Sequence, residues 1–88
     1  MNGTCYLLHF EPAYVHARHY LGWTNRDVAQ RVSEHVRGLG SPLVKAAVQS
    51  GSNVRLVRTW QNVDRYYERA LKNQHNGPRY CPLCKRKG

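Results

Sequence analysis

Acidic residues are scarce in this chain of 88 residues. Five Asp and Glu stand against fourteen Lys and Arg, which gives a formal net charge of +9 and a pI near 10.0. A small protein with this excess attracts polyanions, of which nucleic acid is the commonest in cells. The alternatives are a solvated basic surface or attachment to a membrane surface.

Cysteines and long apolar runs are also few. The three cysteines form an odd number, which argues against a disulfide framework and favours the reducing cytoplasm. No apolar run is long enough for a membrane span, and the first residues lack the basic segment of a signal peptide. We therefore expect a cytoplasmic protein without a membrane partner. Its length predicts a single domain over residues 1–88, with a basic tail from about residue 77.

Three segments have the composition of β-strands. Cys5 to Phe10 is apolar and β-prone, His19 to Thr24 is similar, and Asn53 to Trp60 is rich in Val and Leu. Because Glu11 to Arg18 contains a proline, it is predicted to be a long hairpin loop between the first two strands.

Three further segments have helical patterns. The first begins near residues 24–27, with a hydroxyl or amide cap and Asp27 in its first turn, and stops near residues 38–40. The second opens at Ser41-Pro42 and ends at Gly51. The third runs from Asn62 to about Gln74. Apolar residues mark the inner faces of the first and third helices: Val28, Val32, Val36 and Leu39, then Val63, Tyr66, Tyr67, Ala70 and Leu71. This order predicts an α+β fold, with a small three-stranded, mainly antiparallel sheet flanked by about three helices.

Polar residues on the first and third helices are candidates for chemistry. Arg31 and His35 are four apart, so they share a helix face at the edge of the valine stripe. They either reach a cleft or are an ordinary solvated arginine and a boundary histidine. Glu68 lies beside the apolar face of the last helix and is either a Mg²⁺ ligand or a neutraliser of nearby basic residues. Tyr6 and Tyr20, within the strands, either pack in the fold or bring hydroxyls to a reacting phosphate.

Taken in order, these residues resemble a known nuclease signature. Thr4-Cys5-Tyr6 occupies the place of a GIY element, Tyr20-Leu21-Gly22 matches YIG, and Arg31, His35 and a late-helix Glu68 follow. The series covers most of the chain and resembles the GIY-YIG endonuclease family. The resemblance implies a metal-dependent endonuclease or nickase that cuts nucleic acid, with DNA favoured over RNA.

The resemblance also implies roles for the five residues. Glu68 would hold one Mg²⁺ or Mn²⁺ ion, Arg31 would contact phosphate oxygens, and Tyr6 or Tyr20 would position or deprotonate the attacking water. His35 would assist proton transfer or grip phosphate. One site cuts one strand, so a double-strand break would need a homodimer, a second event or a separate targeting partner.

A non-catalytic nucleic-acid binder with the same fold is the alternative. The first motif keeps only its tyrosine, and Asn76 is a loose match to an asparagine near the end of family domains. Both hypotheses predict salt-sensitive binding of nucleic acid by residues spread along the chain. The expected contacts are Arg18, His19, Trp23, Arg55, Arg58, Lys72 and Arg79, with His16 beside them, whereas Trp60 is expected in the core.

Cys81-Pro82-Leu83-Cys84 has the spacing of half a zinc knuckle. His75 and Cys5 are the evident completing ligands, and a second paired motif is missing. A thiol-bearing tail without zinc is therefore favoured, and a zinc-stabilised interaction module stays a third hypothesis.

Overall fold

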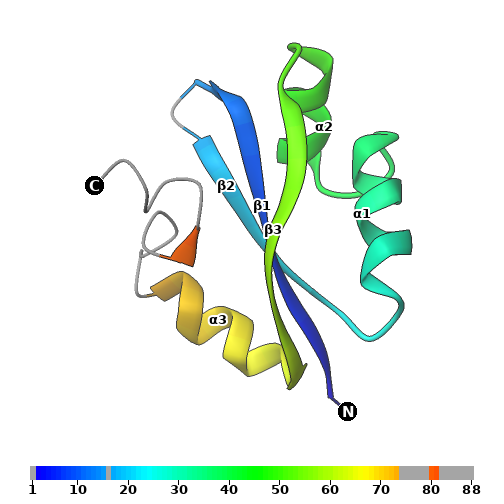
Figure 1. Cartoon of the computed structure of the whole chain (residues 1–88), viewed down its shortest axis with the longest axis vertical. Coiled ribbons are helices and arrows are strands. Elements are labelled where there is room, and N and C mark those ends of the chain that lie inside the picture. The colour runs from blue at the N-terminus through cyan, green and yellow to red at the C-terminus, as the bar shows by residue number, and fades with distance from the viewer. Residues whose placement is uncertain (1, 16, 74–79, 82–88) are drawn as a thin grey trace.

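The computed structural model describes residues 2–15, 17–73 and 80–81, and these form one three-stranded sheet with three helices (Figure 1). The strands are β1 (Gly3–Tyr14), β2 (Ala17–Thr24) and β3 (Asn53–Val63). They lie in the order β2-β1-β3, and β1 is antiparallel to both neighbours. The helices are α1 (Val28–Val36), α2 (Pro42–Gln49) and α3 (Arg65–Asn73). The predicted α+β class is confirmed.

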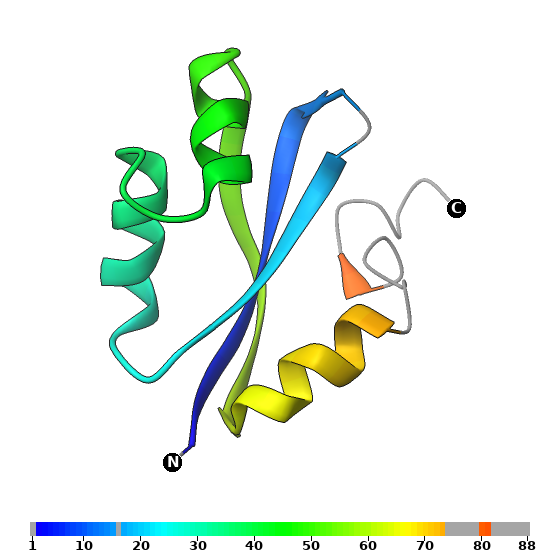
Figure 2. The same cartoon turned by 180° about the vertical axis from the view of Figure 1, so that it is seen from behind.

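Helices cover the sheet on both sides. Figures 1 and 2 show α1 and α2 on one side and α3 on the other. The central strand is therefore buried on both faces from Cys5 to Phe10. Because side chains alternate along a strand, Tyr6, Leu8 and Phe10 join the core beneath α2, and Cys5, Leu7 and His9 project the other way.

The β1–β2 connection is much tighter than predicted. Tyr14 pairs with Ala17, so the long loop expected over Glu11 to Arg18 is wrong. Pro12 predicted a break in the first strand, but at this position β1 makes few backbone hydrogen bonds to its neighbouring strands. Pairing of β1 with β2 is irregular between His9 and Tyr14, and pairing with β3 ends at Glu11. A proline in such a gap removes no required ladder donor.

α1 starts slightly later in the chain than predicted. Asp27 is the N-cap rather than a first-turn residue, because its carboxylate accepts a bond from the Ala29 amide at 3.3 Å. The predicted inner stripe is also only partly right. Val36 is 44% exposed and Leu39 is 66% exposed, whereas His35 is fully buried. His35 is therefore a core residue and not a boundary residue.

The start of α2 was predicted correctly from local sequence signals. Ser41 caps the helix by accepting a bond from the Leu43 amide at 3.2 Å, and Pro42 takes the first helical position, as predicted. The helix ends at Gln49, and Gly51 follows with a φ of 102°, a conformation that favours glycine.

The third helix begins later than predicted, because β3 continues to Val63. Asp64 then bonds the Tyr67 amide at 3.0 Å, and α3 starts at Arg65. Its inner face is narrower than expected. Leu71 is 7% exposed, but Tyr66 is 76% exposed. The predicted end near Gln74 lies outside the described residues. None of the described helices combines the length and apolarity that a membrane crossing requires.

Candidate active site

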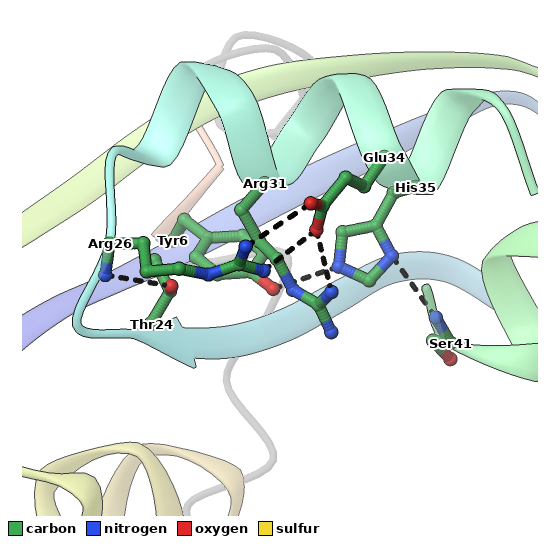
Figure 3. Close-up of polar contacts among 7 residues, drawn as sticks. All are labelled: Tyr6, Thr24, Arg26, Arg31, Glu34, His35 and Ser41. Atoms are coloured by element: carbon green, nitrogen blue, oxygen red, sulfur yellow. Dashed lines mark hydrogen bonds and ion pairs between the residues drawn. The ribbon is translucent and has the colours of Figure 1, made fainter. Parts of the chain in front are cut away.

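Three of the predicted residues meet between the sheet and α1. The Tyr6 hydroxyl lies 2.8 Å from Nε2 of His35 (Figure 3). The Tyr20 ring centroid is 6.4 Å from that of Tyr6 and 5.3 Å from that of His35. Strand register explains the meeting, because Leu8 pairs with Tyr20 and Tyr6 pairs with Gly22. Both tyrosines therefore project from the same face of the sheet.

Two glycines make room for this cluster. A Cβ at Gly22 would overlap the phenol ring and hydroxyl of Tyr6, and a Cβ at Gly40 would overlap Nδ1 of His35. The glycine of the Tyr20-Leu21-Gly22 motif thus has a packing role. Without it, the Tyr6 ring could not lie across β2.

The proton of His35 is fixed by the backbone. The Ser41 amide donates to Nδ1 of His35 at 3.2 Å (Figure 3). An amide is always a donor, so Nδ1 is unprotonated and the neutral ring carries its proton on Nε2. Nε2–H therefore donates to the Tyr6 oxygen. Burial lowers the pKa of His35, and the positive charge of Arg31 lowers it further, so the neutral ring is favoured.

Tyr6 is protonated at neutral pH. Burial raises the pKa of Tyr6 above its ordinary value of 10.0, although Arg31 opposes this as a hydrogen-bond donor and as a positive charge. The Tyr6 side chain is 1% exposed, whereas Tyr20 is half-buried. Of the two tyrosines, Tyr20 is thus the more accessible to a ligand.

Arg31 joins the cluster and is held by a residue that the sequence analysis missed. Nη1 of Arg31 lies 3.0 Å from Glu34, whose carboxylate also bonds Arg26 at 2.8 and 3.3 Å (Figure 3). These arginines lower the pKa of Glu34, with Arg31 contributing most. The (i, i+3) spacing of Arg31 and Glu34 on a helix was the signal that could have found this pair.

Glu68 lies on α3, on the other side of the sheet from α1 (Figures 1 and 2), so the structure does not bring it into contact with Tyr6, Tyr20, Arg31 or His35. Nζ of Lys72 lies 2.8 Å from Oε1 of Glu68 and 5.8 Å from the Tyr20 ring centroid. Burial raises the pKa of Cys5, which projects away from Tyr6, and the negative charge of Glu68 raises it further. The side chain of Glu68 is 19% exposed. Lys72 is the ion-pair partner of Glu68 within the described residues. This pair supports the alternative interpretation, in which Glu68 neutralises a nearby positive charge.

The predicted nucleic-acid contacts are spread over several surfaces. Arg18, Arg55 and Arg58 are exposed, but Arg58 pairs with Leu7 and lies on the side of the sheet opposite Tyr6. There its guanidinium stacks 4.8 Å from the Trp60 ring, which is half-buried. The structure thus does not bring Arg58 to the Tyr6 side.

Other predicted contacts are engaged within the fold. Trp23 donates its Nε1 proton to the Val63 carbonyl at 2.9 Å, and the Arg65 guanidinium lies 5.5 Å from the centroid of its ring. Burial, with help from His9 and Arg18, lowers the pKa of His19 to about 4, so His19 would meet phosphate as a neutral ring.

Several residues that the sequence analysis singled out lie beyond the part of the chain that the structure describes. His16, His75, Asn76, Arg79 and Cys84 lie outside the described residues.

Comparison with known proteins adds no relative. No family model matches the chain, and no curated protein or solved structure matches it either.

Proposed function

We propose that the protein is a metal-dependent endonuclease or nickase that hydrolyses phosphodiester bonds of nucleic acid, with DNA as the expected substrate. The supporting observation is the convergence of Tyr6, Tyr20 and His35, joined by a hydrogen bond of 2.8 Å and by close ring contacts, with Arg31 as a further hydrogen-bond donor to Tyr6. These are four of the five residues that the resemblance to GIY-YIG endonucleases singles out, and the fifth, Glu68, lies on α3 on the other side of the sheet from α1 (Figures 1 and 2). The net charge of +9 supports a polyanionic substrate.

Arg31 is the group proposed to bind the scissile phosphate. Its guanidinium is half-buried and oriented by Glu34, so it is fixed in direction before any ligand arrives. A guanidinium with free N–H groups can bond two non-bridging oxygens at once, and it stabilises the charge that develops as water adds to phosphorus.

The accessible tyrosine and the buried tyrosine have different proposed roles. Tyr20 is half-buried, so its hydroxyl is the one proposed to position the attacking water. The Tyr6 oxygen accepts from Nε2–H of His35, which leaves the Tyr6 proton to be donated. His35 is fully buried, so we assign it a positioning role on Tyr6 rather than a grip on phosphate.

Glu68 fits the requirements of a Mg²⁺ or Mn²⁺ ligand. Mg²⁺ is often held by one or two carboxylates while water and substrate phosphate complete its shell, so a single partly exposed carboxylate is an adequate protein contribution. Lys72 pairs with Oε1 of this carboxylate at 2.8 Å, so a bound ion would compete with its positive charge. The ion would supply Lewis-acid stabilisation of the departing oxygen.

Plasmid nicking tests this proposal. Supercoiled DNA is incubated with the protein in Mg²⁺, Mn²⁺ or EDTA, and nicked and linear products are separated on a gel. We expect nicked circles in either metal and none in EDTA, since one site cuts one strand. Linear product at high protein concentration would indicate a homodimer or two independent events.

A matched pair of variants identifies the metal ligand. Glu68→Gln removes one negative charge from α3 and should abolish cleavage while binding to labelled duplex persists. Asp64→Asn removes the same charge near the start of the same helix, and because asparagine also caps helices well, it should cut normally. Normal cutting by Glu68→Gln would refute the metal assignment.

Internal ion pairing favours a second candidate function, a non-catalytic nucleic-acid binder. Arg31 and Glu68 each have a partner within the chain, Glu34 and Lys72 respectively, and such pairs can serve structure alone. This function predicts salt-sensitive DNA binding with no cutting in Mg²⁺ or Mn²⁺. The nicking assay therefore separates the two candidates.

A further inference from the structure

A second cluster lies on the side of the sheet opposite Tyr6. It consists of His9 on β1, His19 on β2 and Cys81 beyond α3. One ligand atom from each side chain lies within 4.8 Å of the other two. Nδ1 of His9 is 3.2 Å from Nε2 of His19 and 3.5 Å from Sγ of Cys81. We propose that His9, His19 and Cys81 form a structural zinc site, independent of the proposed nuclease activity.

The spacing suits a tetrahedral ion. Zinc binds histidine nitrogen at about 2.0–2.1 Å and thiolate sulfur at about 2.3 Å, so ligand atoms around it are separated by about 3.3–3.8 Å. The separations of 3.2 and 3.5 Å at His9 lie close to this range, and the separation between His19 and Cys81, within 4.8 Å, would shorten by up to about 1 Å when an ion binds. Two imidazoles and one thiolate are also a donor set that zinc prefers, whereas Mg²⁺ and Ca²⁺ prefer oxygen.

The sheet holds the two histidines in place. His9 and His19 are directly opposite each other in the β1–β2 register, so the backbone fixes their separation. His9 is also oriented from its other side, because its Nε2 lies 3.6 Å from the Glu11 carboxylate. A carboxylate thus stands beside the ring nitrogen of His9 that the cluster does not use, an arrangement common for histidine ligands of metals.

The position of Cys81 suggests what the zinc would do. Cys81 is fully buried and meets a histidine 72 residues earlier in the chain. An ion at this point would tie the segment after α3 to the middle of β1. A domain this small gains much of its stability from such a cross-link, since its hydrophobic core alone is limited.

Cys84 follows Cys81 at the C-x-x-C spacing of many zinc sites, and it lies outside the described residues. The sequence analysis considered His75 and Cys5 as completing ligands. Cys5 is not part of the cluster, and burial raises the pKa of its thiol to about 11, which disfavours the thiolate that binds metal.

Metal analysis of the full chain tests the proposal. Protein purified without chelator is measured for bound metals, then stripped and titrated with Zn²⁺ or Co²⁺. We expect one zinc per chain, and in the cobalt form the visible absorption of a tetrahedral ion with a thiolate-to-cobalt band in the near ultraviolet. Failure of the stripped chain to bind either ion in stoichiometric amount overturns the proposal.

Variants assign the ligands. Cys81→Ser should remove the thiolate-to-cobalt band or weaken it, and His19→Ala should lower zinc affinity at least tenfold, whereas Cys5→Ala should retain the full zinc content. Cys84→Ser decides whether a fourth protein ligand is present. If Cys81→Ser does not fold, His19→Ala and the cobalt spectrum of the unmodified chain still test the site. Unchanged zinc affinity in His19→Ala would overturn the assignment.

One further variant keeps this test separate from that of nuclease activity. Glu68→Gln should lose cleavage but keep its zinc, because Glu68 is not in the cluster. Loss of zinc from Glu68→Gln would contradict the proposal of two independent metal sites.

Discussion

Replacement of Tyr6 by phenylalanine removes the buried hydroxyl at the centre of the candidate active site. Tyr6→Phe keeps the ring in the core and removes the oxygen that accepts from Nε2–H of His35 at 2.8 Å and from the Arg31 guanidinium. Both residues are buried, so water cannot easily take the place of the lost oxygen. A buried donor left without an acceptor costs about 1–3 kcal/mol. At about 2 kcal/mol, the Tm of a chain of this size should fall by roughly 8–16 °C.

Urea unfolding followed by tryptophan fluorescence measures this cost. Tyr20→Phe is the matched control, because it removes the same atom from a half-buried ring and should change stability by less than about 0.5 kcal/mol. The double variant Tyr6→Phe/His35→Leu should cost less than the sum of its single changes, since both bonded partners are then apolar. Equal stability of Tyr6→Phe and Tyr20→Phe, or strict additivity in the double variant, would refute the assignment of a buried Tyr6–His35 bond.

Three further predictions concern residues around this bond and on the opposite face. Gly40→Ala should destabilise the fold by about 1–3 kcal/mol in urea unfolding, because its methyl group overlaps the His35 ring, and the same change should cost less in a chain that already carries His35→Ala. Because the folded pKa of His35 lies below 6.5, the unfolded chain binds more protons in acid. Stability should be fully present above pH 6.5 and fall as the pH drops from there toward the folded pKa, and His35→Gln should show a smaller fall; equal pH profiles would contradict this. With a thiol pKa of about 11, Cys5 should resist alkylation at pH 7.5 until urea unfolds the chain, as peptide mapping by mass spectrometry would show.

The secondary structure was predictable where local chemistry decides it. The serine–proline pair at residues 41–42 defines the start of α2 whatever surrounds it, because the cap and the fixed proline φ act within one turn. The order of strands and helices followed in the same way from periodicity. Element ends were less certain, and β3 continues to Val63 past the expected limit because its pairing with Gly3 extends it.

Features set by distant partners were not predictable. The β1–β2 turn was misplaced because Pro12 is a break signal in sequence, and only the pairing of both neighbours shows that its position needs no amide. The burial of His35 likewise depends on Tyr6 as its acceptor and on the space at Gly40. The periodicity of apolar residues placed His35 at the edge of the buried face of the helix, because a sequence pattern carries no information on either contact.

The candidate residues were found in part. The sequence pointed to Tyr6, Tyr20, Arg31 and His35, which the structure brings together, and to Glu68, which lies on the other side of the sheet from α1 (Figures 1 and 2) and pairs with Lys72. His9 was missed as a possible ligand. A lone histidine in an apolar strand was a signal, but its partner His19 could be identified only from the strand register.

The alternation of side chains along β1 makes that strand sensitive to changes in its length. Tyr6 and His9 are three positions apart on the same strand and project to opposite sides. Insertion or deletion of one residue between them would keep one of them in register and turn the other to the wrong layer. We therefore expect the stretch Cys5–Phe10 to accept conservative replacements one position at a time, and to lose at least one of the two clusters whenever its spacing changes by a single residue.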